Sequence, residues 1–278
     1  VMEVVIQDDA HAAALLTARL ISKELRAKPS LVLGLATGRT MESVYRELIR
    51  MRKEEKLDFS LCRTFNLDEY VGLAPENQHS YRYFMNNRLF DHINIDKRNT
   101  HVPDGLAADL DAECARYDRQ IEECGGIDLQ LLGIGVAGHI GFNEPLSALR
   151  SRTRLKALSP ATIAQNAPLF DSPDQMPKRG LTMGVGTILE SRYCLTLATG
   201  SEKASIVAKA VEGPITSMVS ASALQLHPRC HVIVDEAAAS GLQGHDYYRW
   251  IFDNEPDWAE FRQKAEPRKK TLNKRKRR

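Results

Sequence analysis

The sequence lacks the features that mark several specialised classes of protein. No apolar run in its 278 residues approaches the roughly 18 residues that cross a bilayer. The first residues, VMEVVIQDDAH, carry neither the basic flank nor the small-residue cleavage site of a secretory signal. The five cysteines are scattered and form no C-x-x-C pair, which argues against a disulfide framework or a zinc knuckle. We therefore expect a cytoplasmic protein with no membrane partner.

The composition is that of an ordinary globular protein, with 43% apolar and 27% charged residues. The net charge of +2 conceals an uneven distribution. Eight of the 38 Lys and Arg residues lie in the final segment RKKTLNKRKRR, which leaves residues 1–267 with 30 basic and 36 acidic side chains and a net charge of −6. We predict one domain over residues 1–267 and a basic, disordered tail over residues 268–278. Such a tail could instead bind nucleic acid, which we do not expect here.

Short apolar segments alternate along the chain with segments of helical periodicity. The apolar segments predict strands at residues 31–36, 62–67, 127–134, 193–198 and 230–235. The periodic segments predict one helix that begins after a cap at Asp8 or Asp9 and ends near residue 26. They predict further helices at residues 41–53, 80–90, 107–124, 201–211 and 247–261. This alternation is typical of an α/β protein whose parallel sheet has helices on both faces.

Three predicted strands are followed by polar loops. The loops are TGRT at residues 37–40, DEY at residues 68–70 and GHIGFNEP at residues 138–145. Ligands of parallel sheets bind in the crevice at the carboxyl ends of the strands. We therefore expect the three loops to converge on one site.

The first loop consists of Thr37, Gly38, Arg39 and Thr40 and precedes a predicted helix. Backbone N–H groups at a helix start, with a glycine that permits close approach and hydroxyls beside it, form a cradle for an anion. Arg39 would add positive charge. An ordinary strand–helix turn with a threonine cap explains the same residues. The loop alone therefore does not distinguish an anion-binding site from such a turn.

The second loop begins with two adjacent carboxylates, Asp68 and Glu69. Neighbouring side chains of an extended chain point to opposite sides, so only one of them can face a given pocket. A carboxylate in a dry crevice has a raised pKa that suits a general base. A helix cap or a solvated acid pair is the alternative interpretation of this dipeptide.

The third loop places His139 and Glu144 among glycines that allow unusual backbone conformations. A histidine that transfers protons needs a partner to fix its tautomer, and a nearby carboxylate can do so. The alternative is a histidine that merely bonds the backbone. No second histidine lies at metal-ligand spacing, so we expect no metal site.

Together these motifs resemble those of the glucosamine-6-phosphate deaminase family, also called glucosamine-6-phosphate isomerase. The matching segments run in family order from about residue 31 to 235: LGLATGRTMESVYREL, TFNLDEYVGL, SYRYFMNNRLFDHI, LLGIGVAGHIGFNEP, SRTR, TMGVGTIL, GSEKA and SALQLHP. The resemblance implies a modified doubly wound, Rossmann-like fold with a mostly parallel sheet. It also implies conversion of glucosamine 6-phosphate and water to fructose 6-phosphate and ammonium, in N-acetylglucosamine catabolism, without a metal or organic cofactor.

The same resemblance implies a role for each candidate residue. Asp68 is the base that moves a proton between C2 and C1 of the open-chain sugar. His139 opens the pyranose ring, with Glu144 as its partner carboxylate. Residues 37–40 form the phosphate-binding loop, and Lys203 of GSEKA contacts the phosphate.

The chain departs from the family pattern at three positions. Ala137 replaces a residue, Asp or sometimes Asn, that lies two positions before the histidine. Arg39 replaces the second glycine of the usual TGGT loop, and Pro168 occupies the position of a familiar phosphate-binding arginine. Our interpretation is that Arg39 compensates for the missing arginine, because a guanidinium binds phosphate in a bidentate manner.

Other functions remain open at this point. One is deamination of another amino-sugar phosphate such as galactosamine 6-phosphate. Another is a 6-phosphogluconolactonase activity, which the FNLDEY and GHIGFNEP motifs disfavour. The third is a non-catalytic sugar-phosphate sensor. Arg154 and Lys156 lie where basic residues of an allosteric site for N-acetylglucosamine 6-phosphate would be expected, but such a pair also suits a solvated strand face. A homo-oligomer is possible, and the sequence does not fix its size.

Overall fold

Seven short strands form a parallel sheet in the order β1-β10-β9-β6-β2-β3-β5. The computed structural model describes residues 1–262. The strands are β1 (Met2–Gln7), β2 (Val32–Leu35), β3 (Arg63–Asn66), β5 (Thr100–His101), β6 (Leu129–Gly133), β9 (Cys194–Ala198) and β10 (Cys230–Asp235). After β2 the chain adds β3 and β5 on one side, and from β6 onward it adds strands on the other. This reversal between β2 and β6 confirms the predicted doubly wound α/β fold.

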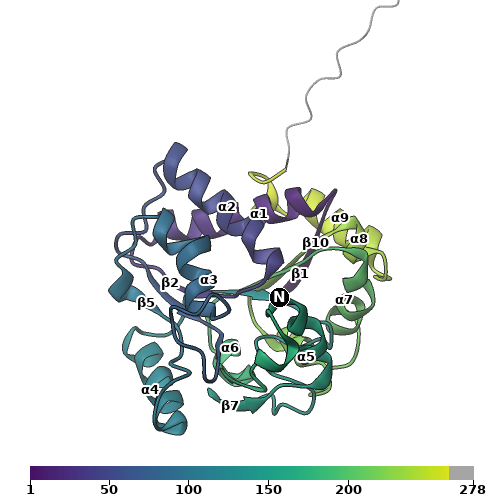
Figure 1. The fold of residues 1–278 in the computed structure, drawn as a ribbon. Coiled ribbons are helices and arrows are strands. Elements are labelled where there is room, and N and C mark those ends of the chain that lie inside the picture. Colours follow the sequence, from purple (N-terminus) through teal and green to yellow (C-terminus); the bar gives the residue numbers. More distant parts are fainter. Residues whose placement is uncertain (263–278) are drawn as a thin grey trace, which may run out of the picture.

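Helices cover both faces of this sheet. They are α1 (Ala10–Ala27), α2 (Arg39–Glu54), α3 (Tyr81–Arg88), α4 (Leu110–Glu123), α5 (Pro160–Asn166), α6 (Val185–Leu189), α7 (Ala204–Val211), α8 (Glu236–Ala239) and α9 (His245–Asn254). Figure 1 shows α1, α2 and α9 on one side of the sheet and α4 and α6 on the other. The main hydrophobic core fills the space between the sheet and these helices. None of the helices in residues 1–262 is both long and apolar enough to cross a membrane.

Local sequence signals explain where several helices begin. The Asp9 carboxylate accepts a hydrogen bond from the Ala12 N–H, and the Ser80 hydroxyl accepts one from the Tyr83 N–H. Both are N-caps of the usual kind, which satisfy a backbone donor that the helix leaves free. The predicted helices at these two places are confirmed, to within a few residues at their ends.

A second, antiparallel sheet was not predicted from the sequence. It consists of β4 (Asp68–Tyr70), β8 (Arg179–Thr182) and β7 (Arg154–Ala157), in that order. The DEY segment, which we expected as a loop, is therefore a strand in which Asp68 lies opposite Thr182. A small apolar cluster packs against this sheet and contains Tyr70, Phe142, Leu158, Phe170 and Met176.

Three further expectations need correction. Strands β1 and β5 were missed, although β1 pairs along its whole length with β10 and β5 pairs with β3. The helix expected over residues 247–261 ends at Asn254 and is followed by a separate turn at Pro256–Trp258, because a proline ring does not fit inside a helix. Helix α4 begins at Leu110 behind an Asp109 cap, not at residue 107. The predicted basic tail, residues 268–278, lies outside the described residues, as do residues 263–267.

Candidate active site

Four neighbouring strands of the large sheet carry the candidate residues at their carboxyl ends. In the order β9-β6-β2-β3, the strands are followed by the Lys203 segment, the His139 loop, residues 37–40 and Asp68. The reversal of strand order falls between β6 and β2, in the middle of this group. The three polar loops predicted from the sequence thus leave adjacent parallel strands, at the place where such sheets bind ligands.

Asp68 is buried and lies against the His139 loop. Its Oδ2 atom is 3.6 Å from the point where a Cβ atom on Gly141 would lie. Burial raises the pKa of Asp68 well above its usual value, and the negative charge of Glu69 raises it further. Within residues 1–262, no hydrogen bond offsets these two effects. A carboxyl group in this state keeps its proton to higher pH than an exposed one and is a stronger base when ionised.

Glu69 has a different role from its neighbour. Its carboxylate accepts hydrogen bonds from the N–H groups of Tyr70, Tyr81 and Arg82, at 2.8 to 2.9 Å. Burial nevertheless raises the pKa of Glu69 to about 7, because the loss of hydration outweighs these three donors. Glu69 therefore ties β4 to the first turn of α3, while Asp68 faces the site. The helix-capping alternative considered for the pair holds for Glu69 alone.

His139 is held in one tautomer by the backbone. Its Nδ1 atom lies 2.6 Å from the Gly141 carbonyl oxygen, which can only accept, so Nδ1–H donates and Nε2 carries the lone pair of the neutral ring. Burial lowers the pKa of His139, and Lys203 acts in the same direction, against the influence of Glu144 and of the Gly141 carbonyl. The half-buried imidazole is thus kept neutral, with Nε2 ready to accept a proton.

The glycine at position 135 makes room for this ring. A Cβ atom there would lie 2.1 Å from Nε2 of His139, which is far below any real contact. The Gly135 N–H also donates to the His139 carbonyl oxygen at 2.9 Å. The glycine-rich loop is therefore required by the close approach of the imidazole to the backbone.

Glu144 does not bond His139 directly, contrary to the expected carboxylate–histidine pair. Its Oε1 atom accepts from the Ser159 N–H at 3.0 Å, and its buried Oε2 atom has no partner within residues 1–262. The orienting partner of His139 is the Gly141 carbonyl. Glu144 lies close enough to influence the imidazole through its charge.

Residues 37–40 form the turn that leads from β2 into α2. Gly38 caps the helix with φ of +113°, in the region that favours glycine. Thr37 lies beside Tyr81, whose pKa is raised well above its usual value by burial and, to a smaller extent, by the charge of Asp68. The side chain of Arg39 is exposed at the start of the 16-residue helix α2, where the helix dipole favours an anion.

Lys203 reaches the same region from the strand next to β6. Its ammonium group donates to the Ile134 carbonyl oxygen at 2.8 Å, at the beginning of the His139 loop. Burial lowers the pKa of Lys203. The turn that carries Lys203 begins at Gly200, whose N–H donates to both carboxylate oxygens of Asp235 at 3.1 Å. The lysine thus has a fixed position beside the loop.

Several residues around the site were missed by the sequence analysis. The most important is Thr162 of α5, whose Oγ1 atom lies 3.4 Å from Nε2 of His139. Its helix begins with Ser159 as cap and Pro160 in the first turn, a start signal that was readable in the sequence. Tyr81, between Thr37 and Asp68, had no comparable signal.

Arg154 also belongs to this region, as a support for the loop. Its guanidinium donates to Oδ1 of Asn143 at 2.8 Å and to the Ser147 hydroxyl at 2.9 Å. Asn143 in turn donates to the carbonyl oxygens of Ile140 and Met183, both at 2.8 Å. The solvated-face interpretation is therefore wrong for Arg154, which anchors the loop after His139.

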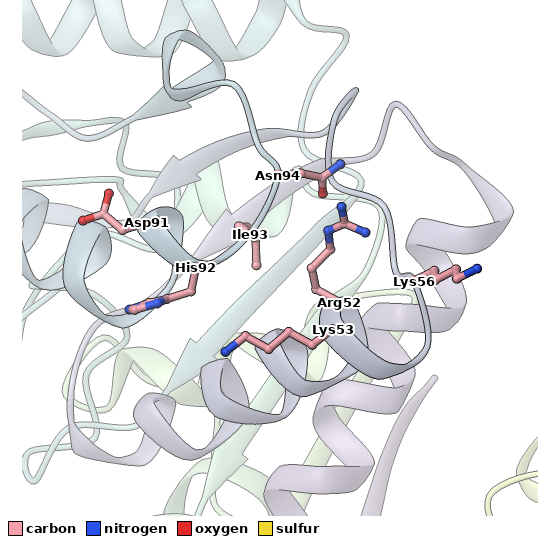
Figure 2. Close-up of a pocket in the computed structure, with 7 residues that line it drawn as sticks. All are labelled: Arg52, Lys53, Lys56, Asp91, His92, Ile93 and Asn94. Atoms are coloured by element: carbon pink, nitrogen blue, oxygen red, sulfur yellow. The ribbon is translucent and has the colours of Figure 1, made fainter.

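Two surface depressions lie elsewhere. One, of about 430 Å³, is lined by Arg52, Lys53, Lys56, Asp91, His92, Ile93 and Asn94. Figure 2 shows Arg52 and Lys53 extending into it from the last turn of α2. This is the opposite end of the helix from Gly38, roughly 24 Å away at 1.5 Å per residue. The second, of about 370 Å³, lies around Gly125, Arg152 and Glu190. Within residues 1–262, no group of three or more His, Cys, Asp or Glu side chains is placed to hold a metal ion.

The buried state of Asp68 predicts a pH-dependent effect of the substitution Asp68→Asn. Because the pKa of Asp68 is raised in the folded protein, its contribution to stability is present at low pH and is lost as pH rises through the folded pKa. Asparagine stays neutral, so Asp68→Asn should raise the free energy of unfolding by about 1–3 kcal/mol at pH 8 and change it little at pH 4. Urea denaturation at both pH values measures this.

The matched control is Asp109→Asn. Asp109 is an exposed cap of α4 that accepts from the Ala112 N–H, and asparagine caps helices equally well. This variant should match the unsubstituted protein at both pH values. An equal effect of Asp68→Asn at pH 4 and pH 8 would contradict the raised pKa.

The sequence matches a known protein family along most of its length. The profile of the family described as glucosamine-6-phosphate isomerases/6-phosphogluconolactonase matches residues 7–232. The glucosamine-6-phosphate deaminase of Cellvibrio japonicus is 52% identical over 250 residues, which cover 90% of this chain and 95% of that protein. The deaminase of an Arthrobacter species is 49% identical over 257 residues, with 92% and 99% covered.

Solved structures show the same relationship. A structure described as a monomeric glucosamine-6-phosphate deaminase superposes with a TM-score of 0.85 and 44% sequence identity, covering 86% of this chain and all of that one. The 6-phosphogluconolactonase of Trypanosoma brucei superposes with a TM-score of 0.68 at 19% identity, covering 87% and 99%, which shows a shared fold. Because both the profile match and the half-identical relatives span most of its length, the chain belongs to the family of glucosamine-6-phosphate isomerases and 6-phosphogluconolactonases.

Proposed function

We propose that the protein is a glucosamine-6-phosphate deaminase, which converts glucosamine 6-phosphate and water to fructose 6-phosphate and ammonium. The observation that carries this proposal is the placement of Asp68, a buried carboxyl group with a raised pKa, against the loop that holds a neutral His139. Relatives of that name match 90% of the chain at about half identity. The reaction needs one group for ring opening and another for proton transfer between carbons, and the site offers both.

Ring opening is assigned to His139. The closed sugar must lose a proton from its C1 hydroxyl and gain one at the ring oxygen. The Nε2 atom, whose lone pair is free because Nδ1–H donates to Gly141, can accept the first proton and return it to the ring oxygen. The lowered pKa of His139 favours the neutral form that this step requires.

Proton transfer between carbons is assigned to Asp68. Its carboxylate removes the proton from C2 of the open-chain aldehyde while the C1 oxygen takes up a proton, which gives an enolamine. Return of the proton to C1 gives the C2 imine of the ketose. Water then adds to C2 and ammonia leaves, so the products are fructose 6-phosphate and ammonium. A base with a raised pKa suits this step, because it must both take and return the proton.

The phosphate is assigned to the start of α2 and to Lys203. Gly38 leaves the first N–H groups of α2 accessible, and such groups bind phosphate well. Thr37, Arg39 and Thr40 surround this turn. Lys203 supplies a second positive charge from the neighbouring side of the His139 loop.

The first test is turnover of glucosamine 6-phosphate by the purified protein. We expect release of ammonium together with fructose 6-phosphate in equal amounts. Asp68→Asn should lower kcat by at least roughly 10²-fold, because it removes the base without changing the shape of the side chain. Coupled assays of both products measure this.

Other outcomes separate the alternatives. Turnover of galactosamine 6-phosphate alone would assign the enzyme to another amino sugar. Hydrolysis of 6-phosphogluconolactone without deamination would assign it to the lactonase branch of the family. A rise in Tm with glucosamine 6-phosphate but no product would mean that the site only binds the sugar phosphate.

Arg39 should contribute to phosphate binding, in the place of the arginine that Pro168 replaces. A charge-assisted hydrogen bond contributes about 1.5–3 kcal/mol, so Arg39→Ala should raise KM by roughly ten- to a hundredfold with a smaller effect on kcat. Arg46→Ala is the matched control, because Arg46 is exposed on the same helix. Equal KM values for the two variants would show that Arg39 does not contact the phosphate.

Ala137 should limit the rate of ring opening. An aspartate at this position would place a second carboxylate near His139 and favour the protonated ring as ring opening proceeds. We expect Ala137→Asp to raise kcat/KM for the closed-ring substrate several-fold. Val136→Asp is the control, because it adds the same charge at the next position, which is exposed. If neither variant gains activity, position 137 has no part in ring opening.

A further inference from the structure

A chain of hydroxyl groups leads from the first turn of α5 to His139. The Ser159 hydroxyl donates to Oγ1 of Thr162 at 3.1 Å, and Oγ1 of Thr162 lies 3.4 Å from Nε2 of His139. On the other side of the ring, Nδ1–H donates to the Gly141 carbonyl oxygen. Both nitrogen atoms of His139 therefore have a neutral hydrogen-bonding partner.

The groups at the two ends of this series of hydrogen bonds fix which atoms donate and which accept. Gly141 offers a carbonyl oxygen, so Nδ1 holds the proton and Nε2 is the acceptor. Thr162 already accepts the Ser159 proton, which leaves its own hydroxyl proton to donate to Nε2. The contact of 3.4 Å is at the outer limit of a hydrogen bond, and such contacts in empty sites often tighten when substrate binds.

The helix start holds Thr162 in this position. Thr162 is buried, and its N–H donates to the Ser159 hydroxyl at 3.2 Å. The Ser159 N–H donates to Oε1 of Glu144 at 3.0 Å. The turn at residues 159–162 thus connects Glu144 with His139, although these two side chains do not bond each other.

We propose that Thr162 is a positioning residue for His139, whose hydroxyl donates to Nε2 and holds the imidazole in place before substrate binds. The role in ring opening depends on the function proposed above, whereas the effect on the imidazole does not. A carboxylate near Nε2 would favour the protonated ring, but a donating hydroxyl favours the neutral ring. The substrate hydroxyl would then replace the Thr162 hydroxyl at Nε2.

The charged groups that act on His139 are Glu144, from its own loop, and Lys203, from the turn before α7. Their influences are opposite in sign. A neutral hydroxyl at Nε2 changes neither of these charges. The effect of removing it on the pKa of His139 can therefore be measured while Glu144 and Lys203 stay in place.

The experiment is an NMR titration of His139 in the full chain with isotope-labelled histidine, its signal identified by loss in His139→Gln. Thr162→Val removes the hydroxyl and keeps the shape. We expect its midpoint to move to higher pH by roughly half a pH unit, because a donor to the neutral ring is lost. Thr162→Ser keeps the hydroxyl and should retain the original midpoint.

The matched control is Thr187→Val in α6. Thr187 is also buried, but its hydroxyl has no partner within residues 1–262. An unchanged His139 midpoint in Thr162→Val would overturn the proposal, as would equal shifts in Thr162→Val and Thr187→Val. The titration needs no turnover, so a failure of the proposed deaminase activity is seen separately. In an active enzyme, the low-pH limb of the kcat/KM profile should move by the same amount in Thr162→Val only.

Discussion

The arrangement proposed for catalysis centres on one residue without a side chain, Gly141. Its carbonyl oxygen fixes the tautomer of His139, and the space beside its Cα is occupied by Oδ2 of Asp68 and Oγ1 of Thr182. Its φ of +56° lies in the left-handed region. A larger residue would therefore strain the backbone and crowd the Thr182 hydroxyl, at the peptide unit whose carbonyl oxygen holds His139.

The environments of these two groups drive them in the same direction. Burial raises the pKa of Asp68 and lowers that of His139, so both are driven toward the uncharged form. Because both groups are already largely removed from water, Asp68 as a carboxylate base and His139 as a neutral base can exchange protons with a substrate without first losing a hydration shell. The site thus needs no strong ion pair, which agrees with the neutral partners found on both nitrogen atoms of His139.

Local patterns were sufficient to predict β2, β3, β6, β9 and β10 of the large sheet and the loops at its edge, because a buried parallel strand shows as a short apolar run and a glycine-rich loop is conspicuous. The edge strands β1 and β5 were missed. The small sheet was missed because RLKA and RGLT of β7 and β8 are brief and carry charges, so neither shows a strand pattern. The expected Glu144–His139 pair was wrong for another reason. Which partner a buried carboxylate finds depends on a helix start fifteen residues later, and sequence spacing does not contain that information.

The position of β1 has a consequence for how the chain folds. This first strand lies at the edge of the large sheet, and its partner there is β10, with Val4 opposite Val232. During synthesis β1 emerges long before β10, because the other strands of both sheets lie between them in the chain. Contacts between such distant residues slow folding, because a long loop must close before they form. Until β10 has formed, the apolar residues of β1 can contact other chains. Misassembly would therefore begin with unpaired β1.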